Sequence, residues 1–490
     1  MASGNLTRRN LLRTAGVGAL ALSPAARATF AAARSQHHGR GHVRKPNSLP
    51  FPGRPAGEVN EALPFDHVVV VMMENHSFDC YFGMLSRRGQ RRADGFTFNR
   101  RGVPVNRNPL KGGYVLPYRA TSTCQASVTQ NWNSTHKQIN GGRMNGFAKT
   151  APQSMVYWTE EDLPFYYSLG RTFTLANRWF GSAPCQTYPN RRFLLAGTAY
   201  GLISTDTSSL EDPPPANGTL FDRLDRYGVS WKNYFTDLPG TGVIPSIPEG
   251  HPESLATVSQ FHADCAAGNL PAVSFVDPEF GAAGEVGGPL STLPIPDVGQ
   301  TLSTQGGDEE NPQDIQIGQS FMASVVSSVL SSPSWRRTLL IWLYDEHGGY
   351  YDHIPPPRAI KPDSIPPKLG PGDVPGGYNL YGPRVPAVVV SPHSRPRAVD
   401  DTVCDHTSIL ATIEAKWNLP ACTYRDANAK TVESFLDPHR EAFAEPPKLA
   451  AAPDPAPPGD SSCSTDDPPL VIHRRHRPHR RRGSAESASR

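Results

Sequence analysis

Continuous apolar runs are the feature that most constrains the fold of this chain. Uninterrupted runs rich in Val, Ile and Leu are typical of strands that are buried on both faces of a sheet. Longer segments of helical character separate them, so the pattern predicts an α/β fold with a mostly parallel central sheet and helices on both faces. The expected strands are 67–73, 272–276, 338–344 and 385–390, with weaker candidates at 172–180 and 229–234, and the expected helices are 220–227, 314–330 and 405–417.

The length and the Pro and Gly content fix the expected scale of the fold. A chain of 490 residues is long enough for one large domain or two ordinary ones. The 50 Pro and 43 Gly residues indicate long loops between the elements. We expect one catalytic domain over residues 64–445.

The N-terminus has the features of an export signal. Arg8 and Arg9 precede a modest apolar run at 15–22, and small residues suitable for cleavage follow at 26–28. The arginine pair predicts a twin-arginine signal peptide over residues 1–28 and an exported protein, secreted or held in the cell envelope. Residues 29–63 are expected to form a mobile spacer. No later segment has 18 consecutive apolar residues, so no transmembrane segment is expected in the mature chain.

The C-terminal segment 446–490 is rich in Pro and Ala and then in Arg. Such a composition buries too little apolar surface to fold, so we expect disorder. Six arginines between Arg474 and Arg482 favour an anionic membrane or cell-wall polymer as a partner, with a solvated tail as the alternative. The formal charge of the whole chain is only +3, which argues against a specific nucleic-acid partner.

Seven cysteines lie beyond the expected signal peptide. Their spacing contains no C-x-x-C motif, which argues against a zinc site. In an exported protein some of them are expected to form disulfides, and the odd number leaves at least one thiol unpaired. Cys404 and Cys422 flank an expected helix and are one candidate pair. The cysteines are at positions 80, 124, 185, 265, 404, 422 and 463.

Acidic and amide side chains follow the two clearest strands. Glu74 and Asn75 come directly after 67–73, and Asp345 and Glu346 come directly after 338–344. The carboxyl ends of parallel strands share one edge of a sheet, so these groups can converge there. Their oxygens suit one divalent cation of unknown identity. A solvated loop with ordinary ion pairs is the alternative for either cluster taken alone.

A third cluster supplies a hydroxyl nucleophile. Thr187 is followed by Asn190 and Arg191 in the segment Thr-Tyr-Pro-Asn-Arg. Phosphoryl transfer needs a nucleophile that is activated beside a cation, and a threonine hydroxyl is weak without one. Asn190 and Arg191 are candidates for orienting phosphate oxygens. Taken alone, this segment would more often form a turn.

In this order, three motifs resemble the phosphoesterase family. They are Glu74-Asn75-His76-Ser77-Phe78-Asp79, Thr187-Tyr188-Pro189-Asn190-Arg191 and the segment 345–353. That family contains non-specific phospholipases C and bacterial acid phosphatases, and it is related in fold to alkaline phosphatase. The resemblance implies an alkaline-phosphatase-like fold, with Thr187 as a nucleophile that also touches the metal. The ligands that it implies besides Thr187 are Glu74, Asn75, Asp345 and Glu346.

Three histidines match this family less strongly, and two residues depart from its pattern. The resemblance implies that His136 lies near the phosphate and that His136 or His353 protonates the leaving group, whereas His406 is expected to bind substrate. Asn311 stands where the family often has a His before Pro, and Cys80 stands where a His is expected. Asn311 puts the leaving-group preference in doubt.

The resemblance implies hydrolysis of phosphate esters through a phosphothreonine. Phospholipase C activity on phospholipids is the first expectation, and acid phosphatase activity on soluble monoesters is the alternative. A non-catalytic protein that binds envelope polyanions is a third. Sulfatases use the same Cys-x-Pro-x-Arg spacing, but Thr187 cannot yield their formylglycine.

Overall fold

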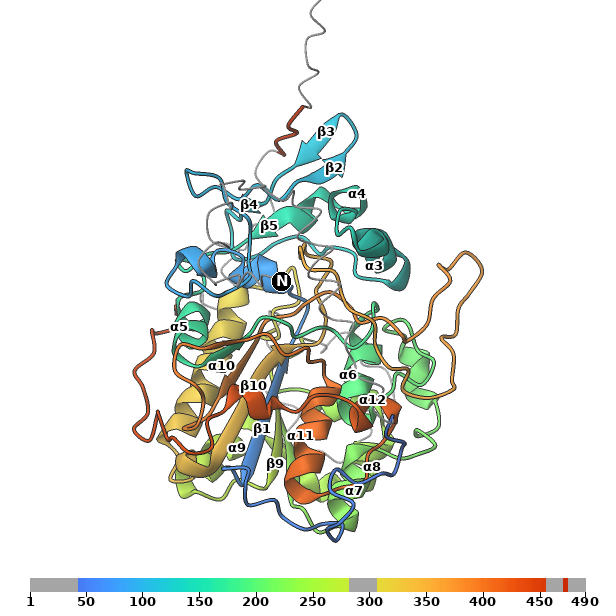
Figure 1. Ribbon diagram of the computed structural model, residues 1–490, viewed down its shortest axis with the longest axis vertical. Coiled ribbons are helices and arrows are strands. Elements are labelled where there is room, and N and C mark those ends of the chain that lie inside the picture. The colour runs from blue at the N-terminus through green and yellow to red at the C-terminus, as the bar shows by residue number, and fades with distance from the viewer. Residues whose placement is uncertain (1–42, 282–305, 455–469, 475–490) are drawn as a thin grey trace, which may run out of the picture. The chain divides into compact units, whose positions relative to one another are not determined.

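One sheet of eight strands forms the centre of the molecule (Figure 1). The computed structural model describes residues 43–281, 306–454 and 470–474, and these belong to one compact unit. The strand order is β12-β6-β11-β10-β1-β9-β7-β8. Each neighbouring pair is parallel except the two that involve β11, which runs antiparallel to β10 and β6. The predicted α/β fold with a mostly parallel sheet is confirmed.

The strands of the main sheet are short apart from the two at its centre. Strands β1 and β10 have seven residues each and pair in parallel from His67 with Thr338 to Met73 with Tyr344. Their side chains are almost wholly buried because helices and loops cover the sheet. The strands are β1 (His67–Met73), β6 (Thr174–Ala176), β7 (Trp231–Phe235), β8 (Leu255–Thr257), β9 (Val273–Asp277), β10 (Thr338–Tyr344), β11 (Ala387–Val390) and β12 (Val399–Asp400).

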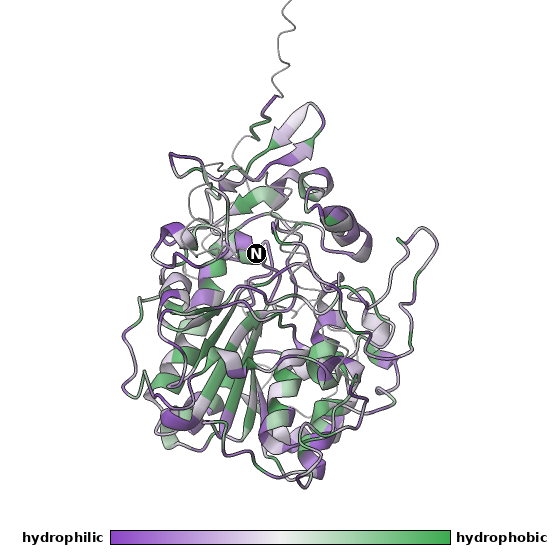
Figure 2. Ribbon diagram, in the orientation of Figure 1, coloured by the Kyte–Doolittle hydropathy of each residue, from purple (hydrophilic) through white to green (hydrophobic). Residues whose placement is uncertain are grey.

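Helices pack against the sheet in two groups, and the hydrophobic residues concentrate in the strands and on the inner helix faces (Figures 1 and 2). Asp314 caps the longest helix, α10, because its side chain accepts from the Gln316 N–H. One group contains α5 (Pro164–Thr172), α9 (Val258–Ala267) and α10 (Ile315–Ser331); the other contains α6 (Thr187–Ala196), α7 (Leu220–Arg226), α11 (Thr407–Trp417) and α12 (Tyr424–Ala427). The short helices α2 (Phe78–Phe82) and α8 (Ser246–Gly250) lie in connections.

A smaller layer, which we call the cap, consists of residues 95–159. It contains the hairpin of β2 (Asn108–Leu110) and β3 (Gly113–Val115), the pair β4 (Tyr118–Arg119) and β5 (Val156–Tyr157), and helices α3 (Trp132–Ile139) and α4 (Phe147–Thr150). Gln138 of α3 bonds to His347 and to the Gly349 carbonyl, in the loop that follows β10. The cap therefore lies at the carboxyl ends of the central strands.

The sequence predicted the central strands well and the edges less well. The bounds of 67–73 and 338–344 are confirmed, whereas the run at 172–180 contains only the three-residue strand β6. The helix expected at 405–417 begins only at Thr407, and the Asp405 side chain accepts no backbone N–H of the first turn. Its carboxylate instead accepts from the Ser182 hydroxyl at 2.8 Å and lies 3.4 Å from Arg425 Nη1.

Two segments expected to be mobile or disordered are in part bound to the domain. Within the expected spacer, Asn47 N–H donates to Ala421 O and Asn60 N–H donates to Lys416 O. Within the expected tail, Ala450 N–H donates to the Ser168 hydroxyl. Residues 1–42, 455–469 and 475–490 lie outside the described residues, and so does the predicted signal peptide.

The cysteines differ from the prediction at one pair. Cys404 and Cys422 are both free and buried, so they form no disulfide with each other. Cys80 is also free and buried, while Cys124 is disulfide-bonded.

No helix among the described residues has the length and apolar character needed to cross a bilayer.

The loops after β1 and β10 touch at Gly348. This residue has φ +61°, and a Cβ there would lie 1.8 Å from the Asn75 carbonyl oxygen. Gly348→Ala should therefore lower the free energy of unfolding by about 3 kcal/mol, through backbone strain and overpacking. Urea midpoints measure this. Gly250→Ala, whose Cβ would meet nothing within 4 Å, is the matched control; equal midpoints for both variants would contradict the close approach.

Candidate active site

The parallel pairing of β1 and β10 brings four predicted ligands to one edge of the sheet. Because Met73 pairs with Tyr344, the residues that follow each strand lie side by side. The Asn75 N–H donates to Asp345 Oδ1 at 3.1 Å, and the Asp345 N–H donates to the Met73 carbonyl at 3.1 Å. Glu346 is adjacent, and its own N–H also donates to Asp345 Oδ1. The predicted convergence of the two clusters is thus present in the structure.

Thr187 is the first residue of α6 and contacts this group. Its hydroxyl is near enough to Asp345 to lower the pKa of that carboxyl, although burial has the larger effect and raises it. The residue is buried, with 7% of its surface exposed. A helix N-terminus presents N–H groups and a partial positive charge, which favour a phosphate oxygen at this point.

Asn190 fixes the loop that leads into Thr187 and does not face a substrate. Its Nδ2 donates to the carbonyls of Cys185 at 2.8 Å and Gln186 at 3.1 Å, and its Oδ1 accepts from the Ala183 N–H at 3.1 Å. The side chain is fully buried. The predicted substrate contact of Asn190 is therefore corrected to a structural role.

Arg191 is paired with the acidic residues of the site. Its Nη2 lies 3.0 Å from Glu74 Oε1 and donates to the Met72 carbonyl at 3.3 Å, and its Nε lies 3.7 Å from Asp345 Oδ2. The guanidinium thus compensates carboxylates. Its predicted part in orienting phosphate stays a prediction.

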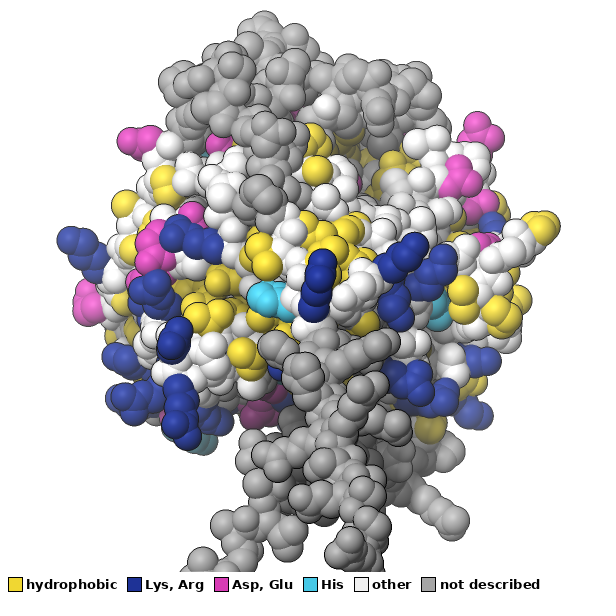
Figure 3. Space-filling model, turned by 90° about the horizontal axis from the view of Figure 1, so that it is seen from above, with side chains coloured by type: hydrophobic (Ala, Val, Ile, Leu, Met, Phe, Trp, Pro, Cys, Tyr) yellow, Lys and Arg dark blue, Asp and Glu magenta, His cyan; other side chains and the backbone are white. Residues whose placement is uncertain are grey.

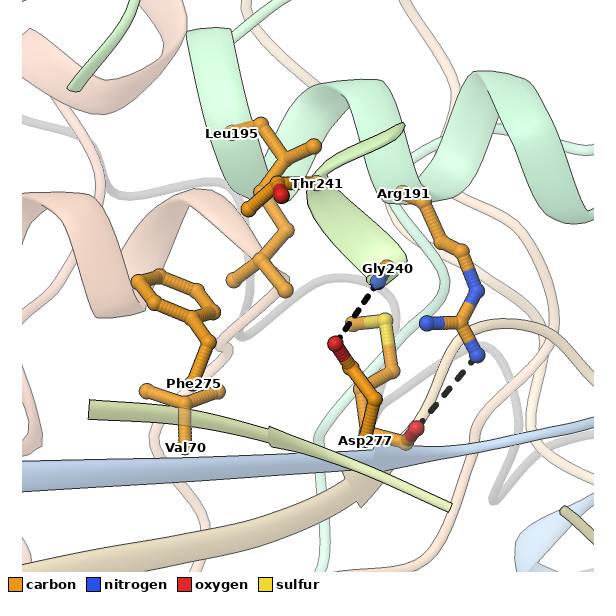
Figure 4. Close-up of a pocket in the computed structure, with 9 residues that line it drawn as sticks. Val70, Arg191, Leu195, Gly240, Thr241, Phe275 and Asp277 are labelled. Carbon is orange, nitrogen blue, oxygen red and sulfur yellow. Dashed lines mark hydrogen bonds between the residues drawn. The ribbon is translucent and has the colours of Figure 1, made fainter. Parts of the chain in front are cut away.

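Behind Arg191 lies a small cavity toward the core (Figure 4). Asp277 closes one side, where its carboxylate accepts from the Gly240 N–H at 2.7 Å. The remaining lining is mostly apolar, including Val70, Leu195 and Phe275. The cavity volume of about 10 Å³ is at the lower limit for one water molecule, so no substrate fits there.

Burial and mutual repulsion disfavour the charged forms of the acidic groups. Burial raises the pKa of Glu346 well above its usual range, and the Asp345 charge raises it further. Burial likewise raises the pKa of Glu74 well above its usual range, with Arg191 opposing and Asp345 adding to the shift. A cation bound among these groups would relieve this cost.

Several polar atoms of this group have no hydrogen-bond partner. They are Asn75 Oδ1, Glu346 Oε1 and Asp345 Oδ2, all buried. Three oxygen donors from neighbouring strand ends that lack other partners fit a divalent cation well. A carboxylate trio of Glu74, Asp308 and Glu310, with ligand atoms within 4.8 Å of one another, adjoins them. The donor set therefore fits the predicted metal.

The segment 308–311 belongs to the site, although only Asn311 of this segment was expected from the sequence to affect the chemistry. The Glu74 N–H donates to the Asp308 carbonyl at 2.9 Å. Between Asp308 and Glu310, the buried Glu309 side chain points the other way and accepts from three tyrosine hydroxyls: Tyr81 at 2.6 Å, Tyr166 at 2.5 Å and Tyr344. Tyr344 directly precedes Asp345, so Glu309 ties this segment to the end of β10.

Gly318 makes room for this tether, because a Cβ there would lie 2.2 Å from Glu309 Cγ. Asn311 is packed beside the tether. Its Nδ2 donates to the Tyr350 hydroxyl and lies 3.5 Å from His76 Nε2. An amide in this place cannot supply the proton that an imidazolium would.

His406 contacts the backbone of the site at Asp345. Its Nε2 donates to the Asp345 carbonyl at 2.6 Å, and its Nδ1 has no hydrogen-bond partner. Burial lowers its pKa to about 4, so the ring is neutral at pH 7. His406 therefore positions Asp345, and its predicted contact with substrate stays a prediction.

His353 lies in a separate ionic cluster. Its Nδ1 is 2.7 Å from Asp79 Oδ2 and its Nε2 is 3.4 Å from Asp94 Oδ1. The buried Arg384 binds Asp352 through two bonds of 2.9 Å and reaches Asp79 at 3.2 Å. With a carboxylate facing each ring nitrogen, His353 is an ion-pair partner here, which corrects its predicted role as the general acid.

His136 lies on the cap helix α3. Its Nδ1 donates to the Trp132 carbonyl at 2.7 Å, and its ring packs on Trp132 with centroids 4.3 Å apart. Burial lowers its pKa. Trp132 packs in the same cluster as Ala183 and Cys185, on the loop before Thr187. His136 is thus near this loop, and only its Nε2 is left for chemistry.

Comparisons with known proteins agree with the motifs. The model of the phosphoesterase family matches residues 65–420. Non-specific phospholipase C1 of Arabidopsis thaliana is 29% identical over 407 residues, which cover 76% of this chain and 71% of that protein. Phospholipase C A of Mycobacterium tuberculosis is 29% identical over 443 residues, which cover 78% of each.

Solved structures are more distant. A protein in the alkaline phosphatase superfamily from Vibrio parahaemolyticus is 10% identical, with coverage of 70% of this chain and 77% of that chain and a TM-score of 0.32. The phosphonate monoester hydrolase of Agrobacterium radiobacter is 13% identical, with coverage of 76% and 77% and a TM-score of 0.35.

The His353 cluster predicts a pH dependence of stability. Burial disfavours the charged ring, but Asp79 and Asp94 together outweigh this and raise the pKa to about 9 from 6.5. A raised histidine pKa stabilises the fold fully below pH 6.5, and this is lost as the pH rises through 9. His353→Gln should therefore cost up to about 3 kcal/mol more at pH 6 than at pH 9.5.

Denaturant unfolding at both pH values measures this difference. His262→Gln is the control, because burial lowers the pKa of His262 and the trend should be opposite. A loss of stability in His353→Gln that does not change with pH would contradict the ion pair.

Proposed function

Since the chain belongs to the phosphoesterase family and is a hydrolase that acts on phosphoric ester bonds, we propose that phospholipids are its substrates and that Thr187 is its nucleophile. The observation that carries the proposal is the contact of the Thr187 hydroxyl with Asp345, at the N-terminus of α6 and beside the unpartnered oxygens of Asn75 and Glu346. The phospholipase C relatives support a phospholipid substrate.

The first step is attack of the Thr187 oxygen on phosphorus. Asp345 accepts the hydroxyl proton, which burial favours because it raises the pKa of this carboxyl. The bond from phosphorus to the alcohol oxygen breaks, and a phosphothreonine forms. On a phospholipid the departing alcohol is diacylglycerol.

A divalent cation held by Asn75, Asp345 and Glu346, with Glu74 and Thr187 at its edge, would neutralise charge on the phosphoryl oxygens and favour the threonine alkoxide. The structure fits calcium, magnesium, manganese or iron by donor type alone. Arg191 lowers the pKa of Glu74 and of Asp345 and so opposes part of the effect of burial.

The departing alcohol needs a proton, and we propose His136 as its source. The Trp132 carbonyl holds the Nδ1 proton, so the second proton of the imidazolium form, on Nε2, is the one that is transferred. The same nitrogen then takes a proton from the water that attacks phosphorus, the bond from phosphorus to the Thr187 oxygen breaks, and Asp345 returns its proton to that oxygen, which restores all three residues. His353 is not assigned to this step, because Asp79 and Asp94 face its nitrogens.

Two other functions are kept as alternatives. One is acid phosphatase activity on soluble phosphomonoesters, and the other is a non-catalytic protein that binds envelope polyanions. Turnover of phosphatidylcholine and of p-nitrophenyl phosphate, with and without a chelator, separates all three. Hydrolysis of the soluble ester alone favours the first alternative, and turnover of neither favours the second.

Export by the twin-arginine route is also part of the proposal. It rests on Arg8, Arg9 and the apolar run at 15–22. Secretion or retention in the envelope would place the enzyme where phospholipids and soluble phosphate esters are accessible.

The nucleophile is tested by substitution. Thr187→Ala should lower kcat by roughly a thousandfold or more, because removal of a nucleophile abolishes the covalent route. Thr187→Ser should retain measurable turnover, since the hydroxyl stays. Thr207→Ala, which removes an exposed hydroxyl farther along the chain, is the control. A Thr187→Ala enzyme with normal turnover and circular dichroism would refute the assignment.

The metal is tested by its stoichiometry. Elemental analysis after dialysis should find one divalent ion per chain in the wild type and almost none in Asp345→Asn/Glu346→Gln, because two oxygen donors lose their charge. Asp264→Asn is the control. It removes the charge of a carboxylate that pairs with Lys232 and is not among the proposed ligands, so this variant should keep the ion. Equal metal content in the double variant and the wild type would contradict the ligand assignment.

A further inference from the structure

The cap is free of acidic residues. Residues 95–159 contain no Asp or Glu and eight basic residues, so the cap is more positive than the +3 of the whole chain and the rest of the chain is net acidic. Arg119 pairs with Asp162, and the other seven form no ion pair with the described residues. The eight are Arg100, Arg101, Arg107, Lys111, Arg119, Lys137, Arg143 and Lys149. A surface of one sign over a whole layer indicates a partner of opposite sign.

The cap lies at the end of the molecule that carries the candidate active site (Figure 1). Figure 3 looks onto this end and shows basic side chains around hydrophobic ones across its middle, with acidic ones mainly near its edges. Gln138 ties the cap to the loop that carries Glu346, through His347 at 2.8 Å. A partner bound to the cap would therefore be near Thr187.

A segment of the C-terminal region adds an apolar element to the cap. His473 exchanges two backbone hydrogen bonds with Tyr114 of β3, at 3.0 and 3.1 Å. The two rings stack with centroids 5.3 Å apart, and the Arg107 guanidinium lies 4.7 Å from the Tyr114 centroid. Residues 470–474 are thus held along the edge of the hairpin.

Three consecutive aliphatic side chains in this segment face solvent. Leu470, Val471 and Ile472 are exposed by 38%, 64% and 43%. Basic residues flank them, with Arg474 in the same segment and Lys111 at the turn of the hairpin. Consecutive exposed aliphatic residues beside cations favour an interface with an apolar interior and an anionic surface.

We propose that the cap and residues 470–474 together form a docking surface for an anionic phospholipid bilayer. The basic residues contact lipid headgroups, and Leu470, Val471 and Ile472 enter the boundary with the acyl chains. A polyanionic polymer would satisfy the charges but leave these aliphatic side chains in water. The proposal deepens the proposed function, because it names the form in which the substrate reaches the site.

The test is co-sedimentation of the full-length protein with vesicles. The wild type should bind vesicles of phosphatidylcholine with phosphatidylglycerol at low salt and bind pure phosphatidylcholine weakly. R100E/R101E/K111E should lower the vesicle affinity by about a hundredfold, since each basic residue near an anionic leaflet contributes roughly a factor of five. None of the three side chains forms a hydrogen bond or ion pair with the described residues that the variant would break.

The matched control reverses three exposed cations outside the cap. K361E/K430E/R440E makes the same change in net charge and should retain vesicle binding. The kcat for p-nitrophenyl phosphate should be unchanged in both variants, because neither touches the site. Absence of phosphatidylcholine turnover by the wild type would refute the proposed function but leave the sedimentation result intact, so the two failures are distinguishable.

A second pair of variants tests the apolar part. V471S/I472S should lower the binding that persists at high salt, where charges are screened, and V43S/V59S, at exposed valines elsewhere, should not. Binding of R100E/R101E/K111E equal to that of the wild type would overturn the proposal. Vesicle binding by V471S/I472S equal to that of the wild type, together with equal binding to wall fragments, would also overturn it and would indicate a polymer as the partner. A change of oligomeric state in V471S/I472S would overturn it too and would indicate a second copy of the chain.

Discussion

The burial of several carboxylates around one guanidinium is the constraint on which the rest of the site depends. Glu74, Asp345 and Glu346 leave the ends of two strands that are buried on both faces, and among the described residues Arg191 is the cation that contacts them. Removing each such charge from water costs several kcal/mol. The surrounding backbone N–H groups and Arg191 offset only part of this. The cation proposed above would offset the rest, so the stability of the site and its proposed chemistry have the same requirement.

The sequence predicted the part of the site that depends on strand pairing. The runs 67–73 and 338–344 are uninterrupted because both faces of the sheet are covered, and their parallel pairing places Asn75 beside Asp345. The segment 308–311 was not predicted as a whole, because no strand delivers it. It reaches the site through the Asp308 carbonyl and the tyrosines around Glu309, which come from three separate elements. Such a tether has no signal in local sequence.

Residue type predicted which groups are present but not where they point. Asn190 has the donors for a phosphate contact, yet its own loop uses all of them. His353 has the chemistry of a general acid, yet Asp79 and Asp94 face its two nitrogens. The expected spacer was misjudged for a related reason, since its backbone bonds go to residues more than 350 positions away in the chain. In each case tertiary hydrogen bonds decide, and composition does not record them.

The distribution of charge bears on how an anionic substrate reaches an acidic site. A phosphate group that approaches Glu74, Asp345 and Glu346 is repelled unless other charges compensate. Arg191 is already paired, so it cannot attract the substrate from a distance. The acid-free cap supplies a positive surface at the same end of the molecule, where it raises the local concentration of anions. In the proposed mechanism two effects act in sequence. The cap attracts the anionic substrate over about a Debye length, and the cation at the site then neutralises the phosphate charge at contact. The proposed arrangement accounts for the presence of both a net acidic site and a net basic cap in one chain.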